Sequence, residues 1–466
     1  MAIRLVNLDR DTPMLLPPDL GDWVAKDDLV RFIVDAVETC DLRLAKVNQR
    51  GSGDAQYPPS MMLALLIYCY ANRLFSSRQI EQATYHHVSV RYLCGNLHPD
   101  HDTVATFRRE NSALLESCFL TVLQLAKELK AFGRLGTVSV DGTKLGARAS
   151  LRANRQGREL EEEIARLQTE IQELLRQAEQ ADALPAPQEA TLAEKLQDKQ
   201  TRRAALQAAK AQLAARQQAS REHRQQQAKG MDPEEPSPPS CPPRGVSTQK
   251  EPPPGGEGEG GPLAAANAPK TINLVDPESR LMRDAHGHYL QGYNAQLVVE
   301  AGEDRSQLIL SARLTNDCND RRALRENLQK VPAELRPELT HVLADTGYDN
   351  ADLIAAVEKE MNLTVLCPPQ TAATPPAPEK YRLSKIQQQR RAQATAMRER
   401  LEKPELQQIY RRRAASVEPV FGVLKNVLGF RRFRLFGLAK SQIELTLLAL
   451  AYNLRQLAQK APAQAA

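Results

Sequence analysis

The sequence is poor in the features from which disulfide frameworks, zinc sites and membrane spans are built. Its seven cysteines are scattered, with no Cys-x-x-Cys pair and no cluster of cysteine with histidine. This spacing argues against a zinc site or a disulfide framework and is typical of a reducing compartment. No apolar run is long enough to cross a bilayer, and the N-terminus lacks a basic-then-apolar secretion signal. We therefore expect a cytoplasmic protein with no membrane partner.

Aromatic residues are also scarce, at 5% of 466 residues with one tryptophan, so that not all of the length is core. The net charge of +5 is small but unevenly distributed. Between Arg382 and Lys440, fifteen Lys and Arg residues stand against four acidic residues. This density of positive charge favours a polyanionic partner, above all nucleic acid. A solvated basic helix would have the same composition.

The first part of the chain has the pattern of short helices. The apolar segment MMLALLIYCYANRLF precedes SSRQIEQATYHH, whose serines suit a helix N-cap, and another helix is expected to begin near Asp102. This order fits a helix-turn-helix, with Arg108 and Arg109 on the helix that enters a DNA groove, or equally a plain helical bundle. We assign residues 1–131 to a helical, DNA-binding domain and 132–156 to the first strand segment of a catalytic domain.

A long insertion follows this strand segment. Apolar residues then repeat at alternating spacings of four and three, which is typical of a coiled-coil seam: Leu160, Ile164, Leu167, Ile171 and Leu174. The repeat breaks at LPAPQ and resumes more weakly, so we predict an antiparallel coiled-coil hairpin over 157–230. Residues 231–269 are rich in Pro, Gly and Glu and predict a disordered linker.

Strand patterns return in residues 270–458, which we assign to the rest of the catalytic domain, followed by a tail at 459–466. HYLQGYNAQLVVEA and SQLILSARLTN alternate as two strands of a hairpin. A helix, a strand in LTHVLADTGYDN, another helix and a strand in LTVLCPP come next, and SQIELTLLALAYNLRQLA closes the fold as a helix. This order predicts an α/β protein with a mixed sheet flanked by helices.

Two of the predicted strands end on aspartates, in SVDGT and LADTG. If these strands are parallel neighbours, Asp141 and Asp345 leave the sheet together. Glu418 is a third candidate, because apolar residues after it could pack its segment on the sheet and aim it at the same place. Three acids with no basic residue among them would repel one another unless a cation lay between them. Taken singly, each aspartate is explained as well by a turn or a helix cap.

Oxygen ligands of this kind suit Mg²⁺ or Mn²⁺. Two such ions about 3.5–4 Å apart can activate a water or a 3′-hydroxyl and stabilise the leaving oxygen of a phosphodiester displacement. Lys144, just after Asp141, could touch a phosphate or be an ordinary surface lysine. We interpret Asp317 and Asp320 as caps of the next helix, and Asn294 and Tyr348 as possible supporting groups of the site.

Four motifs follow one another along the chain in the order that the resemblance described next requires: VDGTKLGARAS, GYNAQ, LADTGYDN, and VEPVFGVLK followed by GFRRFRLFGL. On these and on the segment from YPPSMMLALLIYCY to TFRREN, the chain resembles bacterial DDE-type insertion-sequence transposases. More narrowly, it resembles the insertion-sequence-1182-like group of the insertion-sequence 4/5 assemblage. The resemblance implies a ribonuclease-H-like catalytic domain with Asp141, Asp345 and Glu418 as catalytic acids and ligands of two Mg²⁺ or Mn²⁺ ions. It also implies endonucleolytic cleavage at the element ends and strand transfer into target DNA.

The family carries a Tyr/Arg/Glu/Lys signature around the glutamate. Tyr410, Arg413 and Lys425 match it, except that Arg413 lies five residues before Glu418 where the common pattern has four. We predict phosphate contacts for these residues and for Lys144. The same prediction covers the neighbouring arginines: Arg411, Arg412, Arg431, Arg432 and Arg434. Pairing of two element ends implies a homodimer or higher oligomer. The DNA partner implies association with the nucleoid.

Three other interpretations stay open. The chain could be a catalytically silent, DNA-binding relative of a transposase, a hydrolytic nuclease without strand transfer, or a coiled-coil scaffold with an incidental sheet. Alanine at Asp345 separates the first from an enzyme, because only an enzyme would lose cleavage while it keeps DNA binding. Deletion of residues 157–269 tests the scaffold.

Overall fold

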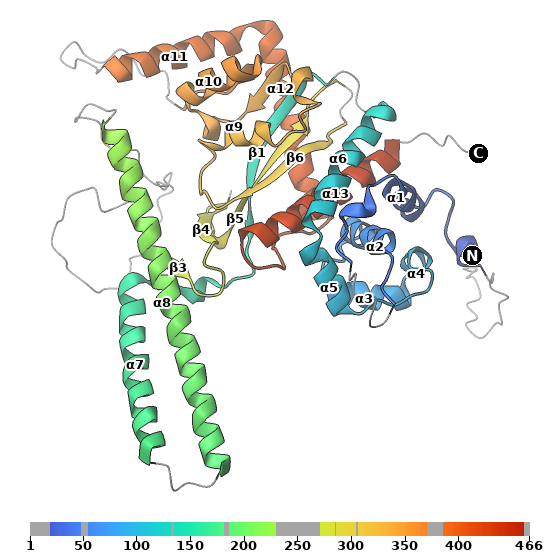
Figure 1. The fold of residues 1–466 in the computed structure, drawn as a ribbon. Coiled ribbons are helices and arrows are strands. Elements are labelled where there is room, and N and C mark those ends of the chain that lie inside the picture. Colours follow the sequence, from blue (N-terminus) through green and yellow to red (C-terminus); the bar gives the residue numbers. More distant parts are fainter. Residues whose placement is uncertain are drawn as a thin grey trace, which may run out of the picture.

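A computed structural model describes residues 19–47, 55–131, 135–180, 186–229, 271–284, 286–303, 306–370 and 385–460. Figure 1 shows a bundle of short helices, a central sheet flanked by further helices, and a long helical hairpin that projects away from the sheet. The linker predicted at 231–269 and the start of the turn LPAPQ lie outside the described residues. None of the helices in the described ranges is long and apolar enough to span a membrane.

The N-terminal bundle contains the short helices predicted for it. Two 3₁₀ turns, η1 (Leu20–Trp23) and η2 (Leu42–Leu44), accompany α1 (Leu29–Glu38), α2 (Pro59–Ala71), α3 (Ser77–His86), α4 (Val88–Leu93), α5 (His101–Glu110) and α6 (Ser112–Glu128). Ser76 caps α3 in a reciprocal capping box with Gln79, as its position before the helix predicts. Helix α2 is apolar on nearly all sides and is correspondingly buried in the centre of the bundle.

The C-terminal helix α13 (Leu438–Lys460) joins this bundle to the sheet. It packs on α2 and α6 on one side and on strand β6 (Ile309–Thr315) on the other. The side chain of Asn453 bonds both the N–H and the carbonyl of Ile309, at 2.9 and 2.8 Å. Gln442 accepts from Leu314 N–H and donates to the Ala312 carbonyl, so side chains of α13 satisfy these backbone groups of the edge strand.

The central sheet has six strands. They are β1 (Thr137–Gly146), β4 (Arg280–Arg283), β5 (Tyr289–Glu300), β6, β7 (His341–Ala344) and β8 (Thr364–Leu366). The order is β4-β5-β1-β7-β8, with β6 also paired to β5. Strand β1 is antiparallel to β5 and parallel to β7, and β7 is parallel to β8. The predicted mixed sheet is therefore confirmed.

The register of β1 and β7 decides where the two aspartates lie. Val140 is the partner of Ala344 in this parallel pair, so Asp141 and Asp345 follow at the same level. Strand β1 does not stop at Asp141, however, and the prediction that it does is wrong. Its pairing with β5 continues to Gly146, because β5 is long enough to hold it, whereas β7 ends at Ala344.

Helices lie against the sheet and its parallel edge: α9 (Ala323–Gln329), α10 (Ala351–Met361), α11 (Lys385–Glu402) and α12 (Pro404–Gly422). Short turns η3 (Leu151–Ala153), η5 (Arg336–Glu338) and η6 (Thr346–Tyr348) connect elements. Helix α12 packs on β1, where the hydroxyls of Ser139 and Ser416 lie 2.6 Å apart. Pro419 deprives α12 of one N–H, and the carbonyl of Ala415 accepts from the side chain of Gln307 instead, at 2.7 Å.

The inserted hairpin consists of α7 (Gly157–Gln180) and α8 (Ala186–Lys229), which pack on each other. Its apolar contact cluster includes Leu160, Leu167, Leu206 and Leu213. At its base, β2 (Asn154–Gln156) pairs antiparallel with β3 (Thr271–Asn273), and Ile272 of β3 completes the cluster. The chain thus leaves and re-enters the sheet domain through one small ribbon.

Candidate active site beside the end of strand β7

Asp141 and Asp345, here called the acid pair, lie where β7 ends. Asp141 Oδ1 accepts from the N–H of Gly142 at 2.8 Å, and Asp345 Oδ1 accepts from the N–H of Gly347 at 2.9 Å. The second contact also caps the turn η6. The two carboxyl groups therefore come from neighbouring strands, and short backbone contacts hold each of them.

Arg413 of α12 lies between the acids. Its Nη2 is 2.8 Å from Oδ2 of Asp141, and its Nη1 is 3.4 Å from Oε1 of Glu418. The prediction that no basic residue lies among the acids is therefore wrong. In this structure Asp141 and Glu418 are not joined directly but both contact the guanidinium of Arg413. The side chain of Arg413 is 16% exposed.

The helical spacing of α12 explains this arrangement. Ser416, Val417 and Val420 form its buried stripe against the sheet, and Arg413 lies one turn before Ser416 on the same stripe. Glu418 follows directly after Val417, and its side chain is 57% exposed. It therefore lies at the margin of the packed face, near the acid pair but turned toward solvent.

The pKa of the Asp141 carboxyl is raised to about 7, chiefly by burial; Arg413 opposes this shift, and the nearby carboxylates of Asp345 and Asp320 add to it. Burial is likewise the main cause of the raised pKa of Asp345, again against the effect of Arg413. The site therefore resists carrying two negative charges at neutral pH. A second cation would relieve that cost.

Asp320 is a fourth acid at this site, and the sequence interpretation missed it. Its Oδ1 accepts from the amide groups of Asn294 and Gln296 at 2.7 and 2.6 Å, and Lys144 Nζ lies 3.6 Å away. Helix α9 begins after Arg322 and has no side-chain cap, so Asp320 is not the helix cap that the sequence suggested. The prolonged β1–β5 pairing is what brings Lys144 and Asn294 opposite each other.

The donor atoms of the acid pair and its neighbours bear on whether a divalent cation fits here. Across the ranges that the structure describes, no group of three or more His, Cys, Asp or Glu side chains has the spacing of a finished metal site. The chemistry nevertheless fits, because the acid pair supplies only oxygen ligands, in a buried place that disfavours their negative charge. Arg413 supplies the positive charge there, and Glu418 is held by Arg413 rather than by the pair.

The predicted basic residues near the C-terminus lie along the continuation of β1. Gly146 N–H donates to the carbonyl of Arg431 at 2.9 Å, and Phe433 N–H donates to the carbonyl of Gly146 at 2.8 Å. Phe430 and Phe433 are buried in an aromatic cluster, while the arginines between and after them are exposed: Arg431, Arg432 and Arg434. Lys425 lies in a π-helical turn, η7 (Val423–Val427), and burial lowers its pKa.

The other predicted contacts have varied surroundings. Tyr410 donates its hydroxyl hydrogen to the carbonyl of Ala344 at 3.2 Å, which ties α12 to the end of β7. Arg412 pairs with Glu303 at 2.8 Å, and Arg411 is exposed, 3.3 Å from the Gln407 amide. Lys144 pairs with Asp320 as described above.

Arg108 and Arg109 differ sharply, although they are adjacent. Arg109 is exposed and lies 3.6 Å from Glu110. Arg108 is 3% exposed and donates to the hydroxyl of Tyr70 and the carbonyl of Phe75, at 3.0 and 2.8 Å. The predicted DNA contact of Arg108 is therefore corrected, since its guanidinium lies in the core of the structure.

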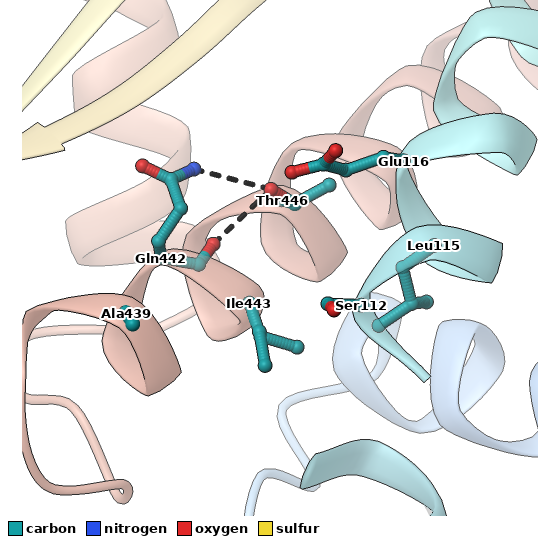
Figure 2. A pocket seen from close by; sticks show the side chains of 7 residues that line it. All are labelled: Ser112, Leu115, Glu116, Ala439, Gln442, Ile443 and Thr446. Atoms are coloured by element: carbon teal, nitrogen blue, oxygen red, sulfur yellow. Dashed lines mark hydrogen bonds between the residues drawn. The ribbon is translucent and has the colours of Figure 1, made fainter. Parts of the chain in front are cut away.

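A separate hollow of about 290 Å³ lies between α6 and α13 (Figure 2). Its walls include Leu115, Glu116, Gln442 and Ile443. None of its lining residues is one of the acids or basic residues predicted for catalysis or DNA contact. Its geometry gives no reason to move the candidate site away from the acid pair.

Comparison with known families identifies two regions of the chain. Residues 267–454 match the family model of the transposase DDE domain, and residues 18–110 match that of a transposase domain, DUF772. Both matched domains are transposase domains. The two matches support a DDE-type insertion-sequence transposase, an enzyme of the transposase kind. No curated protein and no solved structure matches the chain.

The helical hairpin separates Asp141 in sequence from the range that matches the DDE domain. Asp345 and Glu418 lie inside the DDE match, whereas Asp141 lies before it, on the far side of α7 and α8. The register of β1 with β7 restores Asp141 to the neighbourhood of Asp345. Asp141, more than a hundred positions before the matched range, therefore lies near Asp345 in space.

Proposed function

We propose that this protein is a DDE transposase that cleaves DNA at the ends of a mobile element and joins the freed 3′-hydroxyls to target DNA. The observation that carries the proposal is the parallel register that sets Asp141 beside Asp345, with Glu418 one guanidinium away. The strand sequence β6-β5-β1-β7-β8, antiparallel in its first half and parallel in its second, supports a ribonuclease-H-like domain. The order of the sequence motifs supports the insertion-sequence-1182-like group.

The acid pair and Glu418 would hold the cations, and bound Mg²⁺ or Mn²⁺ would supply Lewis-acid activation of the attacking and leaving oxygens. For the cation to bind, Arg413 would have to give up its contacts to Asp141 and Glu418. Its planar guanidinium can exchange the carboxylates of Asp141 and Glu418 for phosphate oxygens by the same paired hydrogen bonds. Arrival of DNA would thereby release both acids for the cation.

The exposed arginines beside the end of β1 would carry the DNA to this site. Arg431, Arg432 and Arg434 are anchored by the buried Phe430, which precedes them, and Phe433, which lies among them, so their charges are held beside the strand that carries Asp141. Phosphate contacts of this kind position a strand without reading its sequence. We propose that the N-terminal bundle adds further DNA contacts, in the nucleoid of a bacterial cell. Pairing of two element ends would require a homodimer or larger assembly, and we propose that the coiled-coil hairpin contributes to it or to DNA contact.

The test is cleavage of duplex DNA that carries the inverted repeats flanking the gene. We expect the full chain with Mg²⁺ to nick this DNA at a 3′ end of the element. Asp345→Asn should reduce the rate at least about 100-fold, because loss of a metal ligand removes several kcal/mol of transition-state stabilisation. DNA binding, measured by gel shift, should be unchanged.

Asp352→Asn is the matched control, because Asp352 is an exposed acid in the first turn of α10, seven residues further along. It should cleave like the unaltered protein. Nicking by Asp345→Asn at the full rate would refute the proposed site. Hydrolysis without joining of the 3′-hydroxyl would reduce the function to that of a nuclease.

A further inference from the structure

Asp320 reaches the candidate site from the β6–α9 connection, a part of the chain that supplies none of the three predicted catalytic acids. Its Oδ1 is fixed by the amide groups of Asn294 and Gln296 and by Lys144. Gln296 is itself held, since its Oε1 accepts from Asn327 at 2.7 Å and from the Tyr348 hydroxyl. Apart from Lys144, the groups of this network are buried, and together they orient this carboxylate.

The second oxygen of Asp320 faces Asp345 across Gly347. A Cβ on residue 347 would lie 2.9 Å from Oδ1 of Asp345 and 3.5 Å from Oδ2 of Asp320. The two carboxylates thus converge on one small space, which the glycine keeps open. On the other side of Asp320, Gly142 leaves room for the hydrogen-bond network, because its Cβ would lie 2.7 Å from Oδ1 of Asp320 and closer still to the amide nitrogen of Gln296.

An unpartnered acceptor lies beside the Asp320 carboxylate, near its Oδ1. Oδ1 of Asn294 is buried and has no hydrogen-bond partner among the described residues, and Asn294 itself is 0% exposed. It lies 3.0 Å from the position of a Cβ on Gly142, next to Oδ1 of Asp320. A buried carbonyl oxygen without a donor is costly unless a ligand satisfies it.

We propose that Asp320 is a further oxygen ligand for the divalent cation that Asp345 binds, with its Oδ2 directed to the metal and its Oδ1 held by the network. This inference rests on the metal-dependent function proposed above. It gives the site four acids rather than three, and it assigns Gly347 to keeping the space between Asp320 and Asp345 open for the cation. Lys144 then balances the charge of Asp320 until the cation is present.

The test is Mn²⁺ binding by the full chain, measured by electron paramagnetic resonance with and without the inverted-repeat duplex. Asp320→Asn keeps the shape of the side chain and should weaken Mn²⁺ binding about tenfold or more. Asp317→Asn, an exposed acid on the same connection, should bind like the unaltered protein. Thermal unfolding in EDTA shows whether each variant is folded.

A second pair of variants removes no carboxylate. Gly347→Ala places a methyl group between Asp345 and Asp320 and should weaken Mn²⁺ binding as well. Gly422→Ala is its control, because a Cβ there meets nothing within 4 Å. Lys144→Met should bind Mn²⁺ at least as tightly as the unaltered protein.

The outcomes separate this inference from the proposed function. If Asp345→Asn abolishes Mn²⁺ binding while Asp320→Asn leaves it unchanged, Asp320 is not a ligand and the proposed function stands. If Lys144→Met weakens binding as much as Asp320→Asn does, Asp320 acts only through Lys144 and the inference fails. An unaltered chain that binds no Mn²⁺ in either condition would overturn both.

Discussion

Arg413 sets the charge of the candidate site, and it does so from a helix that is distant in sequence from both strands. Its contacts to Asp141 and Glu418 place one positive charge among acids whose burial disfavours ionisation. The single arginine therefore compensates only part of the negative charge of the candidate site. Cation binding needs that compensation to be replaced, and DNA phosphate is the natural partner for the arginine that leaves.

The raised pKa of Asp141 predicts a pH-dependent stability. A folded-state pKa of about 7 lies above the usual value for aspartate, so between about pH 4 and pH 7 the folded chain binds more protons than the unfolded chain. Asp141 therefore makes the fold less stable as the pH rises through this range. The free energy of unfolding of Asp141→Asn, taken relative to that of the unaltered protein, should therefore rise by a few kcal/mol from about pH 4.5 to about pH 8. Each unit of pKa difference contributes about 1.4 kcal/mol.

Urea denaturation in EDTA at the two pH values measures this change. The comparison between the pH values isolates the titration from the fixed cost of removing the partner of Arg413. A difference between variant and unaltered protein that is the same at both pH values would contradict the argument.

Single acids of the candidate site could be predicted from the sequence, but the residues that contact them in space could not. Asp141 and Asp345 could be predicted because an aspartate after a β-branched, apolar run is a local pattern. Arg413 and Asp320 could not, because their contacts to Asp141 and Lys144 join residues 272 and 176 positions apart. Only the register of β1 with β5 and the packing of α12 bring these groups together. The prolongation of β1 past Asp141 was missed for the same reason.

At the scale of elements, the strands around the acids were predicted and the small connecting strands were not. Strands β2, β3 and β4 are three or four residues long, too short for an alternating pattern to reveal them. The ribbon of β2 and β3 nevertheless matters, because it brings Gln156 opposite Thr271. It closes the insertion at its base, so the sheet domain does not depend on the hairpin for its connectivity.

Replacement of residues 157–270 by an Asn-Gly turn should therefore leave the sheet domain folded. The two strands of the ribbon already face each other, and a two-residue turn suits such a pair. Ile272, which packs on the hairpin, should be changed to Thr in the same variant so that no apolar side chain is newly exposed. We expect circular dichroism and cooperative thermal unfolding to show an intact domain that still nicks DNA with Mg²⁺.

A control variant that shortens the ribbon itself, by removal of residues 154–156, should unfold. If the variant with the Asn-Gly turn is also unfolded, the hairpin is part of the folding unit and the interpretation as an insertion is wrong. If it is folded and nicks DNA, the scaffold interpretation fails.

At the scale of the whole molecule, α13 holds the N-terminal bundle and the sheet together. Glu444 of α13 accepts from the N–H groups of Arg434 and Leu435 at 2.6 and 2.9 Å and from the Tyr70 hydroxyl at 2.9 Å. Arg108 lies 3.7 Å from the same carboxylate. One buried acid thus connects the bundle, the basic segment beside β1 and the last helix. The domain boundary predicted at residue 131 therefore separates two parts of the sequence that pack together in the structure.

Substitution at the two adjacent arginines tests this connection. Arg108→Met should lower the free energy of unfolding by about 3 kcal/mol or more, because it leaves a buried carboxylate without its cation. Arg109→Met should change it by no more than about 0.5 kcal/mol, since this side chain is exposed. Chemical denaturation measures both. Equal stability of the two variants would show that the buried pair contributes nothing.

The central claim is that the acid pair beside β7 holds a catalytic cation once Arg413 withdraws. The most direct measurement is the anomalous difference map of a crystal of the full chain grown with Mn²⁺ and inverted-repeat DNA. We predict a Mn²⁺ peak within coordination distance of Asp141 and Asp345, with the Arg413 guanidinium on a DNA phosphate. A map without a peak at the acid pair, in which Arg413 still bridges Asp141 and Glu418 beside bound DNA, would contradict the account.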